Sequence, residues 1–240
     1  MEHNDSVTSK TETEQTAVVA AQETAQMSVW KGDFGRAYTD RNMLDSDGLD
    51  RLYHGNYGIG RRELNGAFLH DIAREAAFLE VGCNAGNQLM LLREMGYSNL
   101  SGVELQPYAL EIARKRLSDA SLTQGSALTL PHEDASFDVV FTSAVLIHIA
   151  PEDLPHAMDE IHRCTKSYIW GLEYYWPEVA EVNYRNHSGL LWKMDYARRY
   201  LDRFPDLELV REQRLAYLQD TNVDTMFLLR KKRQDGARMA

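Results

Sequence analysis

The chain has 240 residues, a net charge of −10 at pH 7 and a sequence pI of about 5.3. Hydrophobic residues make up 44% of it, which is enough to bury the core of one α/β domain. The negative charge argues against general binding to a phosphate backbone, and neither an apolar run of membrane-spanning length nor a signal-peptide pattern stands out. We therefore expect a cytoplasmic protein that binds no nucleic acid and no membrane, either as a monomer or as a homodimer.

Two cysteines, Cys83 and Cys164, are present, and we expect both to be free thiols in a reducing cytosol. No cluster of side chains has the spacing of metal ligands, so no metal is expected.

The first quarter of the chain predicts a tail followed by a cap. Residues 1–28 are rich in Thr, Glu, Gln, Ser and Ala and contain no aromatic residue, which indicates a disordered tail. Ordered structure should begin near Trp30, and residues 29–75 should form a cap or lid. Within the cap, Tyr53–Arg62 reads as a glycine-rich loop, and Leu64–Arg74 has apolar residues at helical spacing.

From residue 76 to residue 232, predicted strands alternate with predicted helices, and residues 233–240 form a second tail. The predicted strands are Ala77–Val81, Leu100–Leu105, Leu122–Gly125, Phe137–Ser143, Ser167–Tyr174, Leu207–Leu215 and Thr225–Arg230. The predicted helices are Gln88–Met95, Pro107–Leu117, Pro151–Arg163 and Asp195–Arg203. This order indicates an α/β fold with a Rossmann-like, mostly parallel sheet of seven strands, helices on both faces, an antiparallel hairpin at one edge and an N-terminal helical cap.

The first strand leads into a glycine loop with the pattern acid-x-G-x-N-x-G, from Glu80 to Gly86. A second acid, Glu104, ends the next strand. Bare backbone at a helix N-terminus, with an acid at the end of the following strand, is how parallel α/β sheets hold a nucleoside. The pattern resembles motif I of S-adenosylmethionine (SAM)-dependent methyltransferases, and it differs from the dinucleotide fingerprint G-x-G-x-x-G.

Each part of this motif has a physical task. Gly82 and Gly86 let the backbone approach a ligand closely, and the N–H groups of the following helix face the methionine carboxylate. Glu104 is placed to accept bonds from both ribose hydroxyls, whereas Glu80 either orients the loop or reaches the ammonium through water. We expect Gln124–Ser126 near the adenine and Ser143 under the sulfonium. The predicted cofactor-binding residues are Glu80, Gly82, Cys83, Asn84, Gly86, Glu104, Leu105, Gln124, Gly125, Ser126 and Ser143.

A third segment, Leu130–Val140, is similar to the L-P-x-x-D-x-S-F-D-x-V stretch before strand four of class I methyltransferases. More narrowly, the chain resembles the methylases associated with pseudaminic acid biosynthesis. The segments that carry this resemblance are Trp30–Gly35, Glu80–Gly86, Val145–Pro155, Glu173–Tyr175 and Tyr184–Ala197. The resemblance runs from about Trp30 to Leu229, and it implies a SAM-dependent methyltransferase for a small molecule while leaving the acceptor open.

Methyl transfer to oxygen or nitrogen invites a general base, because the acceptor must lose a proton. His148, on the turn after strand four, is one candidate; a capping or core-bonded imidazole is an equally good interpretation of it. His187 is a second candidate base. Glu173 and Tyr174 sit at the carboxyl end of strand five, where open α/β sheets place ligand contacts, and we count them among the catalytic candidates.

Aromatic and basic residues predict substrate contacts on two segments. Trp30, Phe34, Tyr38 and Arg41 form either a lid over SAM or a helix packed on the domain. Tyr175, Tyr184 and Arg185 lie in a long connection that either folds over the substrate or contacts a second subunit. The sequence therefore predicts a methyltransferase that acts on an oxygen or nitrogen of a small polar metabolite, sugar-derived or from a natural-product pathway. A protein or peptide methyltransferase and a non-catalytic SAM-fold interaction module remain as alternatives.

Overall fold

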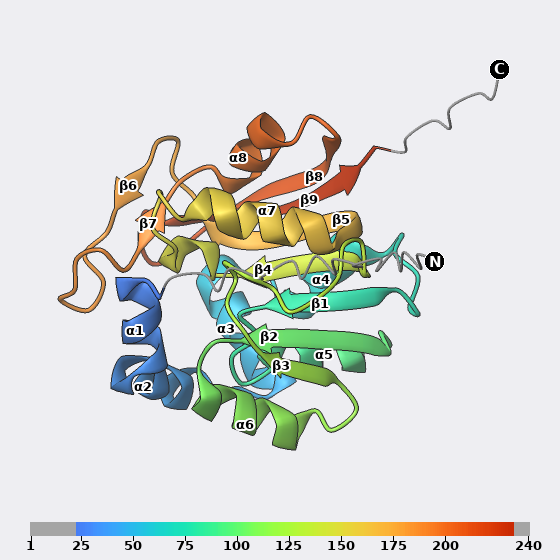
Figure 1. Ribbon diagram of the computed structural model, residues 1–240, viewed down its shortest axis with the longest axis horizontal. Coiled ribbons are helices and arrows are strands. Elements are labelled where there is room, and N and C mark those ends of the chain that lie inside the picture. The colour runs from blue at the N-terminus through green and yellow to red at the C-terminus, as the bar shows by residue number, and fades with distance from the viewer. Residues whose placement is uncertain (1–22, 233–240) are drawn as a thin grey trace, which may run out of the picture.

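The computed structural model describes residues 23–232 (Figure 1). The predicted tails therefore lie outside the described residues, except for residues 23–28 of the first. There the structure differs from the expectation, because a helix begins at Ala25 rather than near Trp30. Thr24 explains this start, since its side chain accepts a hydrogen bond from the Met27 N–H and caps the helix.

Seven strands form the main sheet in the order β3-β2-β1-β4-β5-β9-β8. Their bounds are β1 (Ala77–Val81), β2 (Asn99–Glu104), β3 (Ser121–Gln124), β4 (Phe137–Ser143), β5 (Thr165–Tyr174), β8 (Leu207–Ala216) and β9 (Val223–Lys231). The first five strands are parallel, and β9 runs antiparallel to both of its neighbours. The predicted sheet, with its antiparallel edge hairpin, is thus confirmed.

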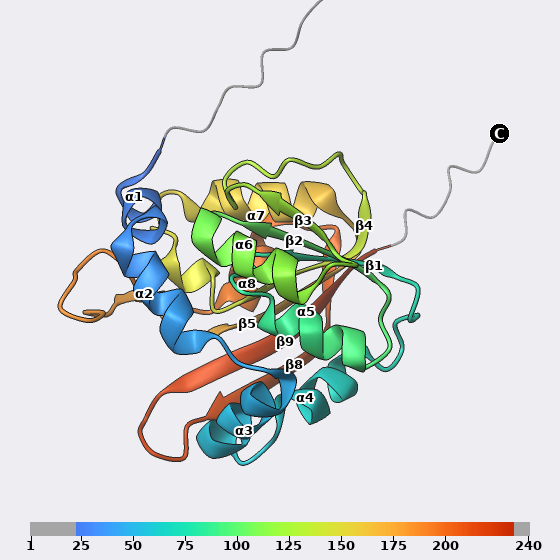
Figure 2. The same cartoon turned by 90° about the horizontal axis from the view of Figure 1, so that it is seen from below.

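The helices cover both faces of this sheet (Figures 1 and 2). Their bounds are α1 (Ala25–Lys31), α2 (Asp33–Asn42), α3 (Ser46–Tyr57), α4 (Arg61–Leu69), α5 (Asn87–Glu94), α6 (Pro107–Arg116), a 3₁₀ turn η1 (Leu146–His148), α7 (Leu154–Cys164) and α8 (Tyr196–Arg203). Capping residues explain several starts: Asp45 accepts from the Gly48 N–H and Asp195 from the Arg198 N–H. The helix predicted to begin at Asp195 thus has this residue as its N-cap.

The predicted loop Tyr53–Arg62 is wrong, because α3 continues to Tyr57 and α4 begins at Arg61. Gly55 lies inside α3 and lowers its intrinsic helix propensity by about 1 kcal/mol relative to alanine. Burial of Leu49 and Tyr53, one turn apart on the same face, compensates for that loss. The helix ends at Gly58, which has a φ of 75° and a backbone N–H that donates to the His54 carbonyl.

The connection after β5 contains structure of its own. A two-stranded antiparallel sheet pairs β6 (Ala180–Glu181) with β7 (Trp192–Lys193), and the chain between them bridges Tyr184 and His187. The sequence predicts a long loop here, without these two short strands.

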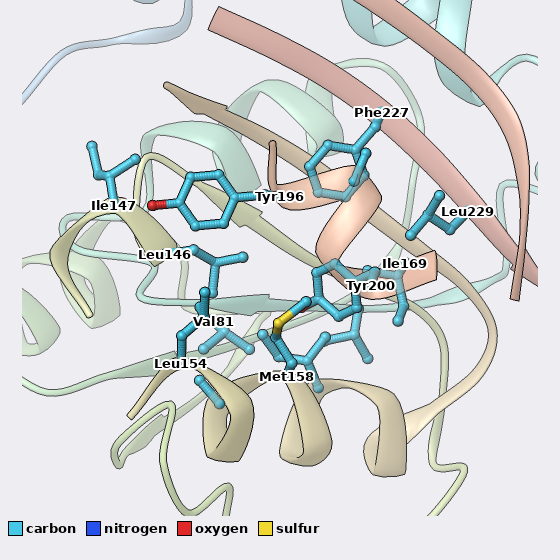
Figure 3. Close-up of a cluster of buried hydrophobic side chains, with 14 of the residues drawn as sticks. Val81, Leu146, Ile147, Leu154, Met158, Ile169, Tyr196, Tyr200, Phe227 and Leu229 are labelled. Carbon is cyan, nitrogen blue, oxygen red and sulfur yellow. The ribbon is translucent and has the colours of Figure 1, made fainter. Parts of the chain in front are cut away.

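Two hydrophobic clusters lie on opposite sides of the sheet. In one of them, side chains of α7 and α8 meet those of the strands, and Figure 3 shows Met158, Tyr196 and Tyr200 converging there with Phe227 and Leu229. The other cluster joins α3, α4 and α5 to the sheet. Because both faces are covered, the strands can be nearly continuously apolar, and only the strand ends remain available for ligands.

Helices α1 and α2 lie across the carboxyl ends of the parallel strands (Figure 1). Gln106, the residue before α6, holds them there: its Nε2 donates to the carbonyls of Trp30, Lys31 and Gly32 at 3.1, 2.6 and 3.1 Å. This amide ties the N-terminal helices to the end of β2.

Candidate active site

One cavity of about 280 Å³ lies between the strand ends and helices α1–α3. Its walls come from the loop after β1, from the ends of β2 and β4, from the segment after β3, and from Trp30, Tyr38 and Tyr53 on the helices. This is the switch point of an open α/β sheet, where strand order reverses between β1 and β4.

The loop after β1 owes its shape to residues with positive φ. Gly82 has a φ of 74°, and a Cβ there would meet Val145 Cγ2 at 2.7 Å. Gly86 has a φ of 78°, and a Cβ there would meet Leu117 Cδ1 at 2.5 Å. Gly82 lines the cavity, whereas Gly86 does not and instead allows α5 to pack against Leu117. The predicted contact of both glycines with the cofactor stays a prediction.

Asn84 occupies the centre of this loop with a φ of 46°, a conformation that asparagine tolerates better than most residues. Its Oδ1 accepts from the Ala85 N–H at 2.8 Å, and its Nδ2 donates to Thr39 Oγ1 at 3.0 Å. Thr39 belongs to α2 and is fully buried. The asparagine of the motif therefore joins the loop to the helix that covers it.

Glu104 lies in the cavity wall with both carboxylate oxygens engaged by backbone. Its Oε2 accepts from the Asn84 N–H and its Oε1 from the Gln106 N–H, each at 2.7 Å. Burial raises the pKa of Glu104, and the bonds from Gln106 and Asn84 oppose that rise. Each oxygen keeps a further lone pair, so the side chain can still accept hydrogen bonds from a ligand.

Glu80, at the end of β1, also lines the cavity and is almost fully buried. Burial raises its pKa strongly, and the positive charge of Arg61 opposes the rise. Its Oε2 has no hydrogen-bond partner among residues 23–232. A buried carboxylate oxygen without a donor is costly, which makes Glu80 a strong acceptor for a donor that a ligand brings.

Arg61 contacts two residues of the cavity wall, and the sequence analysis did not single it out. It is fully buried at the start of α4, and its Nη1 donates to Tyr53 Oη at 2.6 Å and to Ser143 Oγ at 3.3 Å. Tyr53 and Ser143 both line the cavity, although Arg61 does not. Because the two oxygens accept from the guanidinium, their own hydrogens are free to donate elsewhere. The sequence predicts a loop at Arg61, and only the start of α4 at this residue shows that its side chain points into the core.

His148 lines the cavity beside Trp30, with 4.4 Å between the ring centroids. Its Nδ1 donates to the Leu190 carbonyl at 2.7 Å, which leaves Nε2 as an acceptor. Burial lowers the pKa of His148 to about 4, and the bond to Leu190 opposes the fall. The imidazole is therefore neutral at pH 7. It is a poor general base but a good hydrogen-bond acceptor.

The cavity brings together most of the predicted cofactor-binding residues. Those that line it are Glu80, Gly82, Cys83, Asn84, Glu104, Leu105, Gly125, Ser126 and Ser143, with Trp30, Tyr38 and His148 from the predicted substrate and catalytic sets. Gln124 is exposed and lies outside the wall, because strand alternation turns its side chain away from its neighbour Gly125.

Three predicted residues at the end of β5 also lie outside the cavity wall. Glu173 is fully buried and accepts hydrogen bonds from the turn after β4. Tyr174 lies under Lys193, whose Nζ is 5.5 Å from the ring centroid. Tyr175 stacks against Arg214, with 3.4 Å between Cζ and the ring centroid.

The remaining predicted residues lie on the outer side of the cap. Phe34 packs against Tyr184 and His187, with ring centroids 6.0 and 5.3 Å apart. The ring centroids of Tyr184 and His148 are 5.5 Å apart, so Tyr184 packs against the imidazole that lines the cavity. His187, Arg185 and Arg41 are exposed and do not line the cavity.

Within residues 23–232, no group of three or more His, Cys, Asp or Glu side chains is arranged to hold a metal ion. In the same range, no helix combines the length and the apolar character needed to cross a membrane.

Part of this chain is similar to proteins that are already known. Residues 79–168 match the family described as "Methyltransferase domain". The demethylmenaquinone methyltransferase of Chlorobaculum tepidum is 31% identical over 93 residues, which are 39% of this chain and 38% of that protein. The malonyl-[acyl-carrier protein] O-methyltransferase of Serratia marcescens is 28% identical over 139 residues, 58% of this chain and 52% of that protein. The matched regions thus span about half or less of these relatives.

Among solved structures, the 1,6-didemethyltoxoflavin-N1-methyltransferase of Burkholderia thailandensis, with 1,6-didemethyltoxoflavin and S-adenosylhomocysteine bound, has a TM-score of 0.66. The likeness covers 89% of this chain and 93% of that one at 17% identity, and it therefore concerns the fold. Residues 79–168 are thus similar to a methyltransferase domain, and the whole chain shares the fold of a solved methyltransferase.

Proposed function

We propose that the protein is a SAM-dependent methyltransferase. One observation carries the proposal: Gly82, Glu80 and Glu104, which the sequence motif predicts as the cofactor set, line one cavity at the switch point of the sheet. The matches to methyltransferases over the same residues support it. When bound, SAM supplies an electrophilic methyl group on a sulfonium.

The residues present fit this cofactor. Glu104 would accept from the ribose hydroxyls, as its free lone pairs allow, and the partnerless Oε2 of Glu80 would accept from the ammonium. Asn87 and Gln88 line the cavity from the first turn of α5, where backbone N–H groups favour a carboxylate. Gly125 and Ser126 line the cavity after β3 and would contact the adenine.

We further propose that the acceptor is an oxygen or a nitrogen of a small polar metabolite, sugar-derived or from a natural-product pathway. In the reaction the acceptor forms a bond to the methyl carbon, the carbon–sulfur bond breaks, and the acceptor loses a proton. The aromatic cover of Trp30, Tyr38 and His148 favours an enclosed site over an open peptide groove. The resemblance to methylases associated with pseudaminic acid biosynthesis supports the same class of acceptor.

Among these acceptors, the floor of the cavity favours oxygen. Tyr53 and Ser143 both accept from Arg61 and so offer hydrogens to an atom that carries partial negative charge. His148 Nε2 can accept a hydrogen bond from an acceptor hydroxyl and align it. Its low basicity means that alignment and desolvation, rather than strong base catalysis, would supply most of the acceleration.

Two measurements on the full chain test this function. Calorimetric titration with S-adenosylhomocysteine should show saturable binding, and its absence would overturn the cofactor assignment. Methyl-labelled SAM should then be incubated with the protein and with separate pools of small metabolites and of proteins. We expect label in the metabolite pool. Label confined to the protein pool would instead support a peptide acceptor, and label in neither pool would favour a non-catalytic module.

A further inference from the structure

Glu173 is a buried carboxylate with an unusual set of partners. Its Oε1 accepts from the Val145 N–H at 3.3 Å, and its Oε2 from the Ile147 N–H at 3.4 Å. Thr142 adds a side-chain hydrogen bond. Burial and hydrogen bonds from neutral donors are the largest influences on its pKa. A buried carboxylate held by neutral donors alone is costly, which points to a task other than stabilising the fold.

The donors all belong to β4 and the turn that follows it, and that turn forms part of the cavity wall. Ala144 adopts a φ of 55°, and η1 starts two residues later. Val145 closes on Gly82, where a Cβ would lie 2.7 Å from Val145 Cγ2. His148 ends the same turn beside Trp30. The turn therefore sets both the shape of the glycine loop and the place of the imidazole.

The first N–H groups of a helical turn have no partner within the turn, and the carboxylate supplies one. Glu173 reaches them from the neighbouring strand, because β5 pairs with β4 and Leu172 lies beside Ser143. Without this acceptor the Ile147 amide would be buried without a hydrogen bond, and the half-buried Val145 amide would lose its partner as well. The turn would then relax toward other conformations.

We propose that Glu173 is a positioning residue: by accepting from the Val145 and Ile147 amides, it fixes the turn that holds Val145 against Gly82 and His148 at the cavity. Only the expected effect of Glu173 on cofactor affinity rests on the proposed function. We call the two hydrogen bonds from the Val145 and Ile147 amides to Glu173 the clamp. These bonds exist in the protein whether or not it binds a cofactor.

The clamp should depend on the charge of the carboxyl group. Burial raises the pKa of Glu173 to about 7, and the bonds from Thr142 and from the turn oppose the rise. A protonated carboxyl loses acceptor capacity toward one amide, so the turn should loosen as the pH falls through neutrality. Tyr196 and Tyr200 of α8 also face Glu173, and both stay neutral because burial raises their pKa values. His148 titrates only near pH 4 and cannot produce this change.

The test compares Glu173→Gln with wild type in the full chain, and uses Glu178→Gln, an exposed site on the following loop, as the matched control. Hydrogen exchange of the Val145 and Ile147 amides is measured first, without any ligand. At the same pH, near pH 8, we expect exchange at least about 10-fold faster in Glu173→Gln and unchanged in the control. Unchanged exchange at both amides would overturn the proposal.

The second readout is S-adenosylhomocysteine affinity between about pH 6 and about pH 8. Wild type should bind more weakly at the lower pH, whereas Glu173→Gln should bind several-fold more weakly throughout and lose the part of the pH dependence that Glu173 contributes. Wild-type affinity in the variant would overturn the positioning role even if exchange is faster. Failure of wild type to bind at all would count against the proposed function, and the exchange result would still decide whether the clamp exists.

If Glu173→Gln does not fold, the same exchange measurement on Glu173→Asp tests the proposal. The shorter side chain keeps the charge but withdraws the oxygens by one methylene, so exchange at Val145 and Ile147 should again be faster. Exchange as slow as in wild type would overturn the proposal.

Discussion

At the scale of single residues, Glu104 has two roles, and a neutral side chain could not fill both. It accepts from the Asn84 and Gln106 amides, which fixes the glycine loop, and it lines the cavity. In Glu104→Gln one amide would face an NH₂ group, and the charge-assisted bonds to a ribose would be lost. We expect affinity for S-adenosylhomocysteine to fall by ~10-fold or more. Calorimetric titration of the folded variant with S-adenosylhomocysteine measures this affinity.

Glu75→Gln is the matched control for Glu104→Gln, since Glu75 is exposed just before β1. Its affinity should equal that of wild type. Equal affinity in the Glu104 variant would mean that the end of β2 does not contact the cofactor.

The sequence predicts which residues come to the cavity when their place along a strand decides it. It does not predict this where the direction of the side chain decides it. Glu80 and Glu104 end parallel strands, so the pattern alone brings them to one edge. Glu173 also ends a strand, but its side chain enters the core below the turn, which a strand position cannot reveal. Arg61 was missed because its helix was read as a loop.

At the scale of elements, the buried strands were predictable and the cap was not. β1 and β4 have the predicted bounds, because short apolar runs between turns leave little freedom in their ends. Helix α3 carries Gly48 and Gly55 and draws its stability from tertiary contacts of Leu49 and Tyr53, which local propensity does not report. The sequence signal was therefore weakest where packing supplies most of the stability.

The contact between α2 and the glycine loop offers a test at this scale. In Thr39→Val the side chain keeps its shape, but Asn84 Nδ2 loses its acceptor and the Gly35 carbonyl loses a donor. Asn84 is half-buried, so the loss of this hydrogen bond should lower the free energy of unfolding by about 0.5–1.5 kcal/mol. Because Asn84 also donates to Glu104, cofactor affinity should fall as well. Chemical denaturation and calorimetry measure the two effects.

Thr39→Ser keeps the hydroxyl and should stay closer to wild type in both measurements. If the valine and serine variants behave alike, packing of the methyl group rather than the hydrogen bond joins the helix to the loop.

At the scale of the whole molecule, a buried acid helps to join α3 to β9, the strand next to the sheet edge β8. Asp224 of β9 accepts from Tyr57 Oη at 2.5 Å and from Tyr217 Oη at 3.2 Å, and both hydroxyls bond to Oδ2. Its Oδ1 has no partner among residues 23–232, and the residue is 1% exposed. Burial raises the pKa of Asp224 to about 6, and the two tyrosine hydroxyls oppose the rise.

This shift makes global stability depend on pH with a definite sign. Between the ordinary value of 3.8 and about 6, the folded protein keeps a proton on Asp224 that the unfolded chain has released. The folded state binds more protons there, so the free energy of unfolding should fall as the pH rises, by up to about 3 kcal/mol from this group. In Asp224→Asn that contribution is absent, whereas the exposed Asp47→Asn should retain it. The stability of wild type minus that of Asp224→Asn should therefore decrease from about pH 4 to about pH 7 in urea titrations. A difference that stays constant, or that grows with pH, would mean that the carboxyl group is already charged in the folded protein and that a cation or water reaches its open oxygen.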